Sequence, residues 1–204
     1  MKQIPLSFQS VSQYFESFVF PLLEETRAQL FSTMEKVSKA PFAEVVALED
    51  SKPYGAMLYD VKVDCWRNRF SNPGKEPYKT LPGDILVLAY AKPETASDLQ
   101  RVGRMWTFVS VTKITEDENE IDTGSTYFKV KTSKEIQIDR AKKSLFVIFL
   151  TNITSNRRIW KTLHRNRNLK IIKEILRTDS GVSVLEMIFF IMIFLYVMLL
   201  DYIH

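Results

Sequence analysis

The chain has 204 residues, with 28 lysines and arginines against 24 aspartates and glutamates and a formal net charge of +4. Its apolar content of 46% and its charged content of 25% are those of a globular protein, which excludes a wholly disordered chain. The length allows one domain with an appendage, and the single cysteine, Cys65, excludes an internal disulfide and is typical of a reducing compartment.

The first part of the chain, residues 1–41, has apolar side chains at the spacing of a helix. Ser10 or Ser12 precedes this stripe and can cap the N-terminus of the helix. Pro21 lies inside the stripe and predicts a kink or a fresh start of the helix, because proline lacks the amide hydrogen that the helix requires. Helical stripes of this kind usually pack against a core, so we expect a packing role here.

After Pro41 the period of the apolar residues changes from 3.6 to 2, which is the period of strands. Residues 59–65 show this alternation most clearly, with apolar side chains on one face and charged ones on the other. Six such runs follow one another at the spacing of a sandwich or a barrel, separated by turns and by loops such as the polar residues 92–100. We therefore expect a small antiparallel β-barrel over residues 42–154. The expected strands cover residues 42–48, 59–65, 85–90, 104–114, 125–131 and 144–150.

Helical periodicity returns in residues 155–181, which are also strongly basic. Residues 157–177 hold eight lysines and arginines and one acid, Glu174, so the rest of the chain is net negative. Cations beside a tryptophan are typical of contacts with nucleic-acid phosphates. Two other interpretations stay open: a solvated helical face and, if the following tail inserts, the basic flank of a membrane segment. The candidate RNA- or DNA-binding residues are Arg157, Arg158, Trp160, Lys161, Arg165, Arg167 and Lys170.

Residues 182–204 form an apolar tail, within which residues 187–200 are apolar without interruption. A helix of that inner run rises only about 21 Å, whereas residues 182–203 would rise about 33 Å, compared with ~30 Å for the hydrocarbon core of a bilayer. We expect an apolar C-terminal helix, for which three origins are open: a membrane anchor, a buried helix, or translation of a U-rich intron. The third is open because Phe, Leu, Ile, Met and Val codons all have U at the second position.

No recognisable motif for catalysis or for a cofactor is present in the sequence. Gly74-Lys75 lacks the upstream glycine and the following hydroxyl residue of a P-loop, so we expect no ATP hydrolysis. His164, His204 and one cysteine are too few for a Cys/His metal site. Cys65 lies in an expected strand, which favours a structural thiol over a nucleophile. We therefore expect no catalytic residue, no metal and no cofactor, and we predict that the chain is not an enzyme.

Four sequence blocks between Val11 and Leu176 together resemble the sequences of a known family. They are SQYFESFVFPLLEETR at residues 12–27, PFAEV at residues 41–45, YKTLPGDI at residues 78–85 and TNITSNRRIWKTL at residues 151–163. Together they resemble the region that precedes the motor in the plant senataxin-like helicases. These are Upf-type superfamily 1 helicases, also described as tRNA-splicing endonuclease positive effectors.

This resemblance implies an accessory barrel and stalk that help to hold RNA or DNA against a motor, and a nuclear or cytoplasmic location. After Asp179-Ser180 the family continues towards its glutamine motif and its ATPase core, whereas this chain has the apolar tail. The ATP-binding and catalytic residues of the family therefore have no counterparts to which they can be assigned here, which favours a truncated product.

The patterns and the resemblance together predict an α+β protein, in which a small antiparallel β-barrel is flanked by N-terminal and C-terminal helices and followed by an apolar C-terminal helix. The expected function is that of a non-catalytic accessory region of a senataxin-like helicase that binds nucleic acid or a partner protein. The alternative is a tail-anchored membrane protein that presents the barrel to the cytosol and enters the membrane through residues 182–203. A third hypothesis is an enzyme whose site has no recognisable motif.

Overall fold

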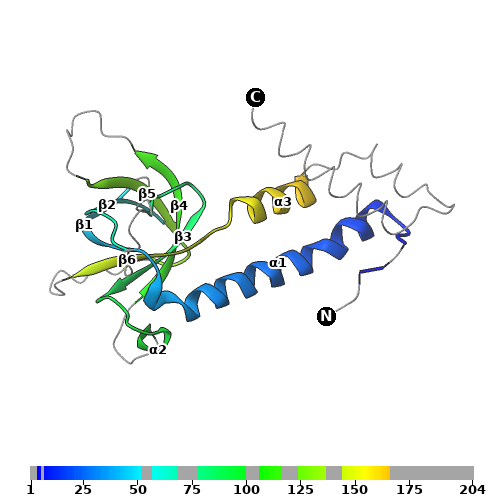
Figure 1. Ribbon diagram of the computed structural model, residues 1–204. Helices are drawn as coiled ribbons and strands as arrows, with labels where there is room; N and C mark the ends of the chain where they lie inside the picture. Colours follow the sequence, from blue (N-terminus) through cyan, green and yellow to red (C-terminus); the bar gives the residue numbers. More distant parts are fainter. Residues whose placement is uncertain are drawn as a thin grey trace. The chain divides into compact units, whose positions relative to one another are not determined.

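The computed structural model describes residues 4–5, 7–51, 57–68, 78–99, 106–115, 124–136 and 144–165 (Figure 1). In these ranges the chain has an α+β fold, in which a long helix precedes six strands and another helix follows them. Each strand agrees with an expected strand to within two residues at either end, so the predicted β part is confirmed. The elements are α1 (Val11–Glu35), the 3₁₀ helix η1 (Val37–Lys39), β1 (Phe42–Asp50), β2 (Leu58–Val63), β3 (Asp84–Tyr90), α2 (Ala96–Leu99), β4 (Trp106–Thr115), β5 (Thr126–Thr132), β6 (Leu145–Asn152) and α3 (Thr154–Arg165).

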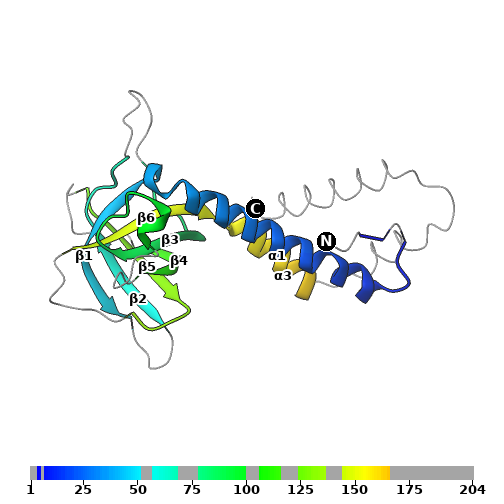
Figure 2. The same ribbon diagram turned by 90° about the horizontal axis from the view of Figure 1, so that it is seen from below.

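The six strands close into a barrel in the order β1-β2-β5-β4-β3-β6, with every neighbouring pair antiparallel (Figure 2). The register shifts at three places, between Val45 and Ala47 in β1, Ile85 and Leu86 in β3, and Val111 and Lys113 in β4. Shifts of this kind are made by β-bulges, which bend a strand and increase its twist. A small sheet needs such bending to close on itself, and the closed sheet has no unpaired strand edge.

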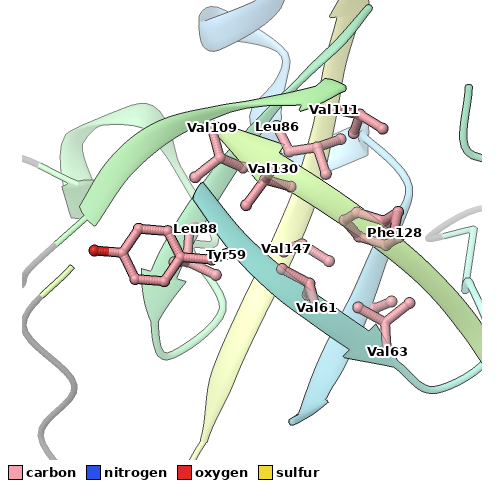
Figure 3. Close-up of a cluster of buried hydrophobic side chains, with 11 residues drawn as sticks. Tyr59, Val61, Val63, Leu86, Leu88, Val109, Val111, Phe128, Val130 and Val147 are labelled. Carbon is pink, nitrogen blue, oxygen red and sulfur yellow. The ribbon is translucent and has the colours of Figure 1, made fainter. Parts of the chain in front are cut away.

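An apolar cluster fills the interior of the barrel (Figure 3). β2 shows how the alternation builds it, because Tyr59, Val61 and Val63 are buried while Asp60 and Lys62 between them are not. The other strands contribute further inward side chains, among which Phe128 of β5 is the largest that is fully buried. Burial of a side chain of this size stabilises the fold by about 2–3 kcal/mol.

A second apolar cluster covers part of the outside of the same barrel. Ile85, Val87 and Ala89 of β3 alternate with the inward positions of that strand, and they pack with Ile148 of β6 and Phe42 of β1. Short helices and the end of α1 complete the cluster. The residues that they contribute are Val37 of η1, Leu99 of α2, and the half-buried Leu30 and Met34 of α1.

α1 is one helix from Val11 to Glu35 with Pro21 inside it, so the expected fresh start of the helix at Pro21 is not found. The N-terminus agrees with the sequence, because the backbone amide of Gln13 donates a hydrogen bond to Oγ of Ser10 at 3.1 Å. A proline within a helix removes one backbone hydrogen bond. Phe15 and Leu22 are buried on either side of Pro21, and we attribute the continuity of the helix to this packing.

The polar residues 92–100, which the sequence indicated as a loop, contain the short helix α2. Oδ2 of Asp98 accepts hydrogen bonds from the backbone amides of Glu94 (2.9 Å) and Thr95 (2.8 Å), which fixes the turn before the helix. Leu99 then enters the second apolar cluster. A single apolar residue has no period, which is why the sequence pattern did not indicate this helix.

Contacts divide the chain into two units, residues 23–158 with the whole barrel, and residues 1–22 together with residues 159–204. In the second unit the aromatic rings of Phe8, Tyr14 and Phe18 pack together, with centroid distances of 5.1 Å for Phe8–Tyr14 and 5.0 Å for Tyr14–Phe18. Burial raises the pKa of Tyr14 above its ordinary value.

The part of the expected basic helical segment that follows residue 165, and the apolar tail, residues 182–204, lie outside the described residues. Among the helices that are described, none has both the length and the apolar character that crossing a membrane requires.

Candidate nucleic-acid interface

The candidate interface is helix α3, and its position depends on a tight junction between the start of β3 and the end of β6. Gly83 has a φ of +90°, in the left-handed region that glycine adopts readily. Its amide donates to the carbonyl of Val111 (2.8 Å), and its carbonyl accepts from the amide of Ile153 (3.0 Å). A Cβ atom at this position would lie 2.1 Å from Oγ1 of Thr154, so the junction requires glycine.

The carboxylate of Asp84 connects the same two strand ends. Asp84 is 1% exposed, and it accepts hydrogen bonds from the amide of Leu81 (2.7 Å), from Nδ2 of Asn152 (2.7 Å) and from the hydroxyl of Tyr78. The three donors are neutral groups, and together they satisfy this buried side chain. Two blocks that are distant in the sequence, residues 78–85 and 151–163, therefore meet at this side chain.

Aromatic packing holds Tyr78 in place beside Asp84. Its ring lies between those of Trp66 (4.5 Å between centroids, edge to face) and Phe149 (4.4 Å). Burial, and then the hydrogen bond to Asp84, raise the pKa of the Tyr78 hydroxyl far above its ordinary value. The tyrosine therefore keeps its proton and remains a hydrogen-bond donor to the carboxylate.

α3 begins directly on this junction. The amide of Thr154 donates to Oδ1 of Asn152 (2.9 Å), and its Oγ1 donates to the carbonyl of Pro82 (3.1 Å). The first bond satisfies one of the amides that a helix N-terminus leaves without an intrahelical partner. Since the backbone amide and the side chain of Thr154 are both bonded to the barrel, the first turn of α3 has a fixed direction relative to β6.

The second half of α1 is hydrogen-bonded to the end of β6 and to the first turn of α3. Nδ2 of Asn156 donates to Oγ1 of Thr26 (2.8 Å), and Nε2 of Gln29 donates to Oγ1 of Thr151 (2.7 Å). These bonds join residues that are more than 120 positions apart in the sequence. They attach α1 to the end of β6 and to the first turn of α3 within residues 23–158.

Cations lie along the exposed side of α3. Arg157, Arg158 and Lys161 are exposed, whereas Ile159 and Leu163 are half-buried. Arg157 and Lys161 are four residues apart and thus lie on one helical face. Within the described part of the chain neither of these two forms a salt bridge. Their charge is available to an anion.

An aromatic pair lies on the same helix. The ring of Trp160, which is 37% exposed, stacks on that of His164 with 4.1 Å between centroids and 28° between planes. Arg165 ends α3, and only its backbone is described; Arg167 and Lys170 lie outside the described residues. Arg157, Arg158, Trp160 and Lys161 are therefore the candidates whose side chains the structure places, and it brings them together on one helix.

An open pocket of about 590 Å³ lies elsewhere, near Phe42. Arg67 lines it and pairs with Asp64, while Nζ of Lys92 lies 3.9 Å above the ring of Phe42. Glu94 also lines the pocket, so its positive charge is partly balanced. Among the described residues there is no group of three or more His, Cys, Asp or Glu side chains that could hold a metal ion.

A family model with the description "Domain of unknown function (DUF6469)" matches residues 1–183. The match covers the barrel, both flanking helices and the whole basic segment, residues 155–181. No curated protein is similar enough to match this chain.

Proposed function

This chain belongs to the DUF6469 family, and we propose that it is a non-catalytic nucleic-acid-binding module, the accessory region of a senataxin-like helicase. The observation that carries the proposal is the exposed face of α3, where Arg157, Arg158 and Lys161 extend from a helix whose first turn is bonded to the barrel. A helix held in this way presents its cations in a fixed arrangement, which reduces the entropy lost on binding a phosphate backbone.

The resemblance to the helicases supports the same proposal at particular residues. The block at residues 78–85 supplies Tyr78, Gly83 and Asp84, and the block at residues 151–163 supplies Asn152 and Thr154. These five residues form the junction that positions α3. Two of the four blocks that carry the resemblance thus supply the residues that direct the basic helix.

The test is charge reversal on α3, with Arg157→Glu, Arg158→Glu and Lys161→Glu combined in the full chain. We expect the wild type to bind a single-stranded RNA or DNA of mixed sequence, with an affinity that falls steeply with salt. Loss of three phosphate contacts should abolish most of this binding and reduce the salt slope by about 2. Fluorescence anisotropy over a series of salt concentrations measures both quantities.

The matched control reverses three exposed lysines that do not belong to α3, Lys36→Glu, Lys39→Glu and Lys79→Glu, and so changes the net charge equally. Binding should persist in this variant with a salt slope close to that of the wild type. An equal loss in both variants would contradict the proposal, because it would mean that total charge determines binding. Salt-insensitive binding, or none by the wild type at low salt, would contradict it too.

A second proposed function, a tail-anchored membrane protein, is favoured by the uninterrupted apolar run over residues 187–200. In that case the full chain should float with neutral phosphatidylcholine vesicles in a density gradient. Replacement of Phe190 and Phe194 by aspartate should keep it in the soluble fraction, because charged side chains in the bilayer core cost several kcal/mol. Wild-type protein that remains at the bottom of the gradient would rule this function out.

A further inference from the structure

The outer surface of the barrel has two unlike halves. Over β3, β6 and the start of β1 it is covered by η1, α2 and the end of α1, which bury Val87 and Ile148. Over β2, β5 and β4 the outward side chains belong to neither apolar cluster. We call this second half the open face, and its outward residues are Leu58, Asp60 and Lys62 of β2, Tyr127, Lys129 and Lys131 of β5, and Trp106, Phe108, Ser110, Lys113 and Thr115 of β4.

Two aromatic side chains of β4 lie exposed on the open face. Trp106 is 37% exposed and Phe108 is 39% exposed, and their rings meet edge to face with 5.1 Å between centroids. They alternate with Val109 and Val111, which point into the barrel. On the outward positions of a half-buried strand polar residues are the rule, so two adjacent exposed aromatic residues indicate a binding surface.

Cations lie beside this aromatic pair and further along the same two strands. Lys131 of β5 lies directly opposite Ser110 of β4, which makes it a diagonal neighbour of Phe108, and Lys113 of β4 lies opposite Lys129 of β5. Lys113 and Lys131 are exposed. In the described residues neither of them has an anionic partner.

The charge of the open face is positive. Its one acid, Asp60, is bound by Lys129, with 2.5 Å between Nζ and Oδ1. Partial burial raises the pKa of the Asp60 carboxyl, but the hydrogen bonds from Lys129 and Ser51 outweigh burial and lower this pKa below its ordinary value. Asp60 is therefore a neutralised carboxylate, and β4 and β5 themselves carry no acid.

We propose that the open face binds single-stranded nucleic acid, with bases stacked on Trp106 and Phe108 and phosphates held by Lys113 and Lys131. The inference rests on the proposed function and names the surface that recognises the bases. Exposed aromatic rings next to lysines, without free acids, are complementary to a polyanion that carries flat apolar rings. The strand must be single, because paired bases do not offer their faces to a side chain.

The open face and α3 contribute different kinds of binding energy, and this makes them separable. The cations of α3 contribute a salt-dependent term that is the same with or without bases. Stacking on Trp106 and Phe108 requires the bases themselves. The difference in affinity between a dodecamer of thymidine and the same dodecamer without bases reports stacking, and loss of this difference on replacing Trp106 and Phe108 assigns the stacking to the open face.

The test measures the affinity of the full chain for these two oligonucleotides by anisotropy, for the wild type and for Trp106→Ala/Phe108→Ala. The wild type should bind the thymidine dodecamer at least about tenfold more tightly than the abasic one. The double variant should bind both about equally. Trp106→Tyr/Phe108→Tyr retains two rings and should keep the preference, which separates loss of stacking from loss of structure.

Phe31→Ala is the matched control, because Phe31 is an exposed aromatic residue (61%) on α1. It should leave the preference for bases unchanged. Lys113→Glu/Lys131→Glu should weaken binding of both oligonucleotides, whereas Lys36→Glu should not. In a Trp160→Phe background, a tryptophan fluorescence change on binding that disappears when Trp106→Phe is added gives an independent readout of base contact.

The outcomes separate the two claims. If the wild type binds neither oligonucleotide, the proposed function fails and this inference fails with it. If it binds both equally, or if Trp106→Ala/Phe108→Ala keeps the preference, the inference is wrong while binding through α3 stands. If a polyglutamate peptide displaces the thymidine dodecamer as effectively as unlabelled thymidine dodecamer does, the face recognises acidic protein segments, and the assignment to nucleic acid is overturned.

Discussion

At the scale of single residues, the junction beneath α3 is held together by a few side chains that the rest of the fold cannot replace. Gly83 is needed for its left-handed backbone and for the space that Thr154 occupies. Asp84 is needed because three donors from two segments that are distant in the sequence converge on it. Loss of such a residue leaves a clash or a buried polar group without a partner, and both are strongly destabilising.

Gly83→Ala should therefore lower the free energy of unfolding by at least about 2 kcal/mol, because backbone strain and the clash with Thr154 act together. Gly124→Ala is the control. Gly124 also has a positive φ, of 67°, but its added Cβ would lie 3.7 Å from the nearest heavy atom, in Cys65, so strain alone should cost about 1 kcal/mol. Urea unfolding followed by circular dichroism measures both. Equal losses would show that the contact with Thr154 is unimportant.

Tyr78 predicts a pH dependence of stability. Its pKa is raised in the folded state by burial and by the hydrogen bond to Asp84. The stabilisation that it provides is therefore complete below the ordinary pKa of 10.0 and is lost as the pH rises above it, since only the unfolded chain ionises.

Tyr78→Phe removes this hydrogen bond and should lower the free energy of unfolding by about 1–3 kcal/mol at neutral pH. The difference between wild type and variant should narrow between pH 9 and pH 11, which urea unfolding at a series of pH values can follow. Parallel curves for the two proteins would contradict the assignment.

At the scale of elements, the unlike halves of the barrel exterior follow from which helices pack on which strands. β3 has six consecutive buried residues, because the barrel interior takes one set of side chains and the helices cover the other. β4 alternates, because only one of its faces is covered. The burial pattern of a strand thus reports whether it has one neighbouring layer or two.

α2 is short, and its contribution to the covering layer depends on Leu99, which is 3% exposed. Leu99→Ala should lower the free energy of unfolding by about 2 kcal/mol or more, because it leaves a cavity in the second apolar cluster. Leu81→Ala is a suitable control, since Leu81 is 52% exposed and should cost less than about 0.5 kcal/mol. Thermal unfolding compares the two. A small effect of Leu99→Ala would show that α2 is not part of the core.

At the scale of the whole molecule, the uneven distribution of charge along the chain agrees with the proposed function. The excess of lysine and arginine is concentrated in residues 157–177, while the rest of the sequence is net negative. The barrel, residues 42–154, carries as many acids as lysines and arginines, but it can still bind a polyanion if its cations share one face, and Lys113 and Lys131 are diagonal neighbours across β4 and β5. Local charge then guides association better than the net charge does.

The periodicity of apolar residues by itself determined the α+β class, the order of the elements and the six strands. It could do so because alternation reports directly whether one face of a strand is buried, as in residues 59–65. The basic character of α3 was also apparent from composition, because the exposure of Arg157, Arg158 and Lys161 on a helix does not depend on residues elsewhere in the chain.

Tertiary structure alone decided which residues meet. The donors to Asp84 come from Tyr78, Leu81 and Asn152, and no local pattern pairs positions almost 70 residues apart. Trp106 and Phe108 looked like ordinary strand residues, and only the closing of the barrel, with helices on its other half, left them exposed beside Lys131. Sequence periodicity indicates which face of a helix or strand is buried. Which residues then become neighbours depends on contacts between positions that are distant in the sequence.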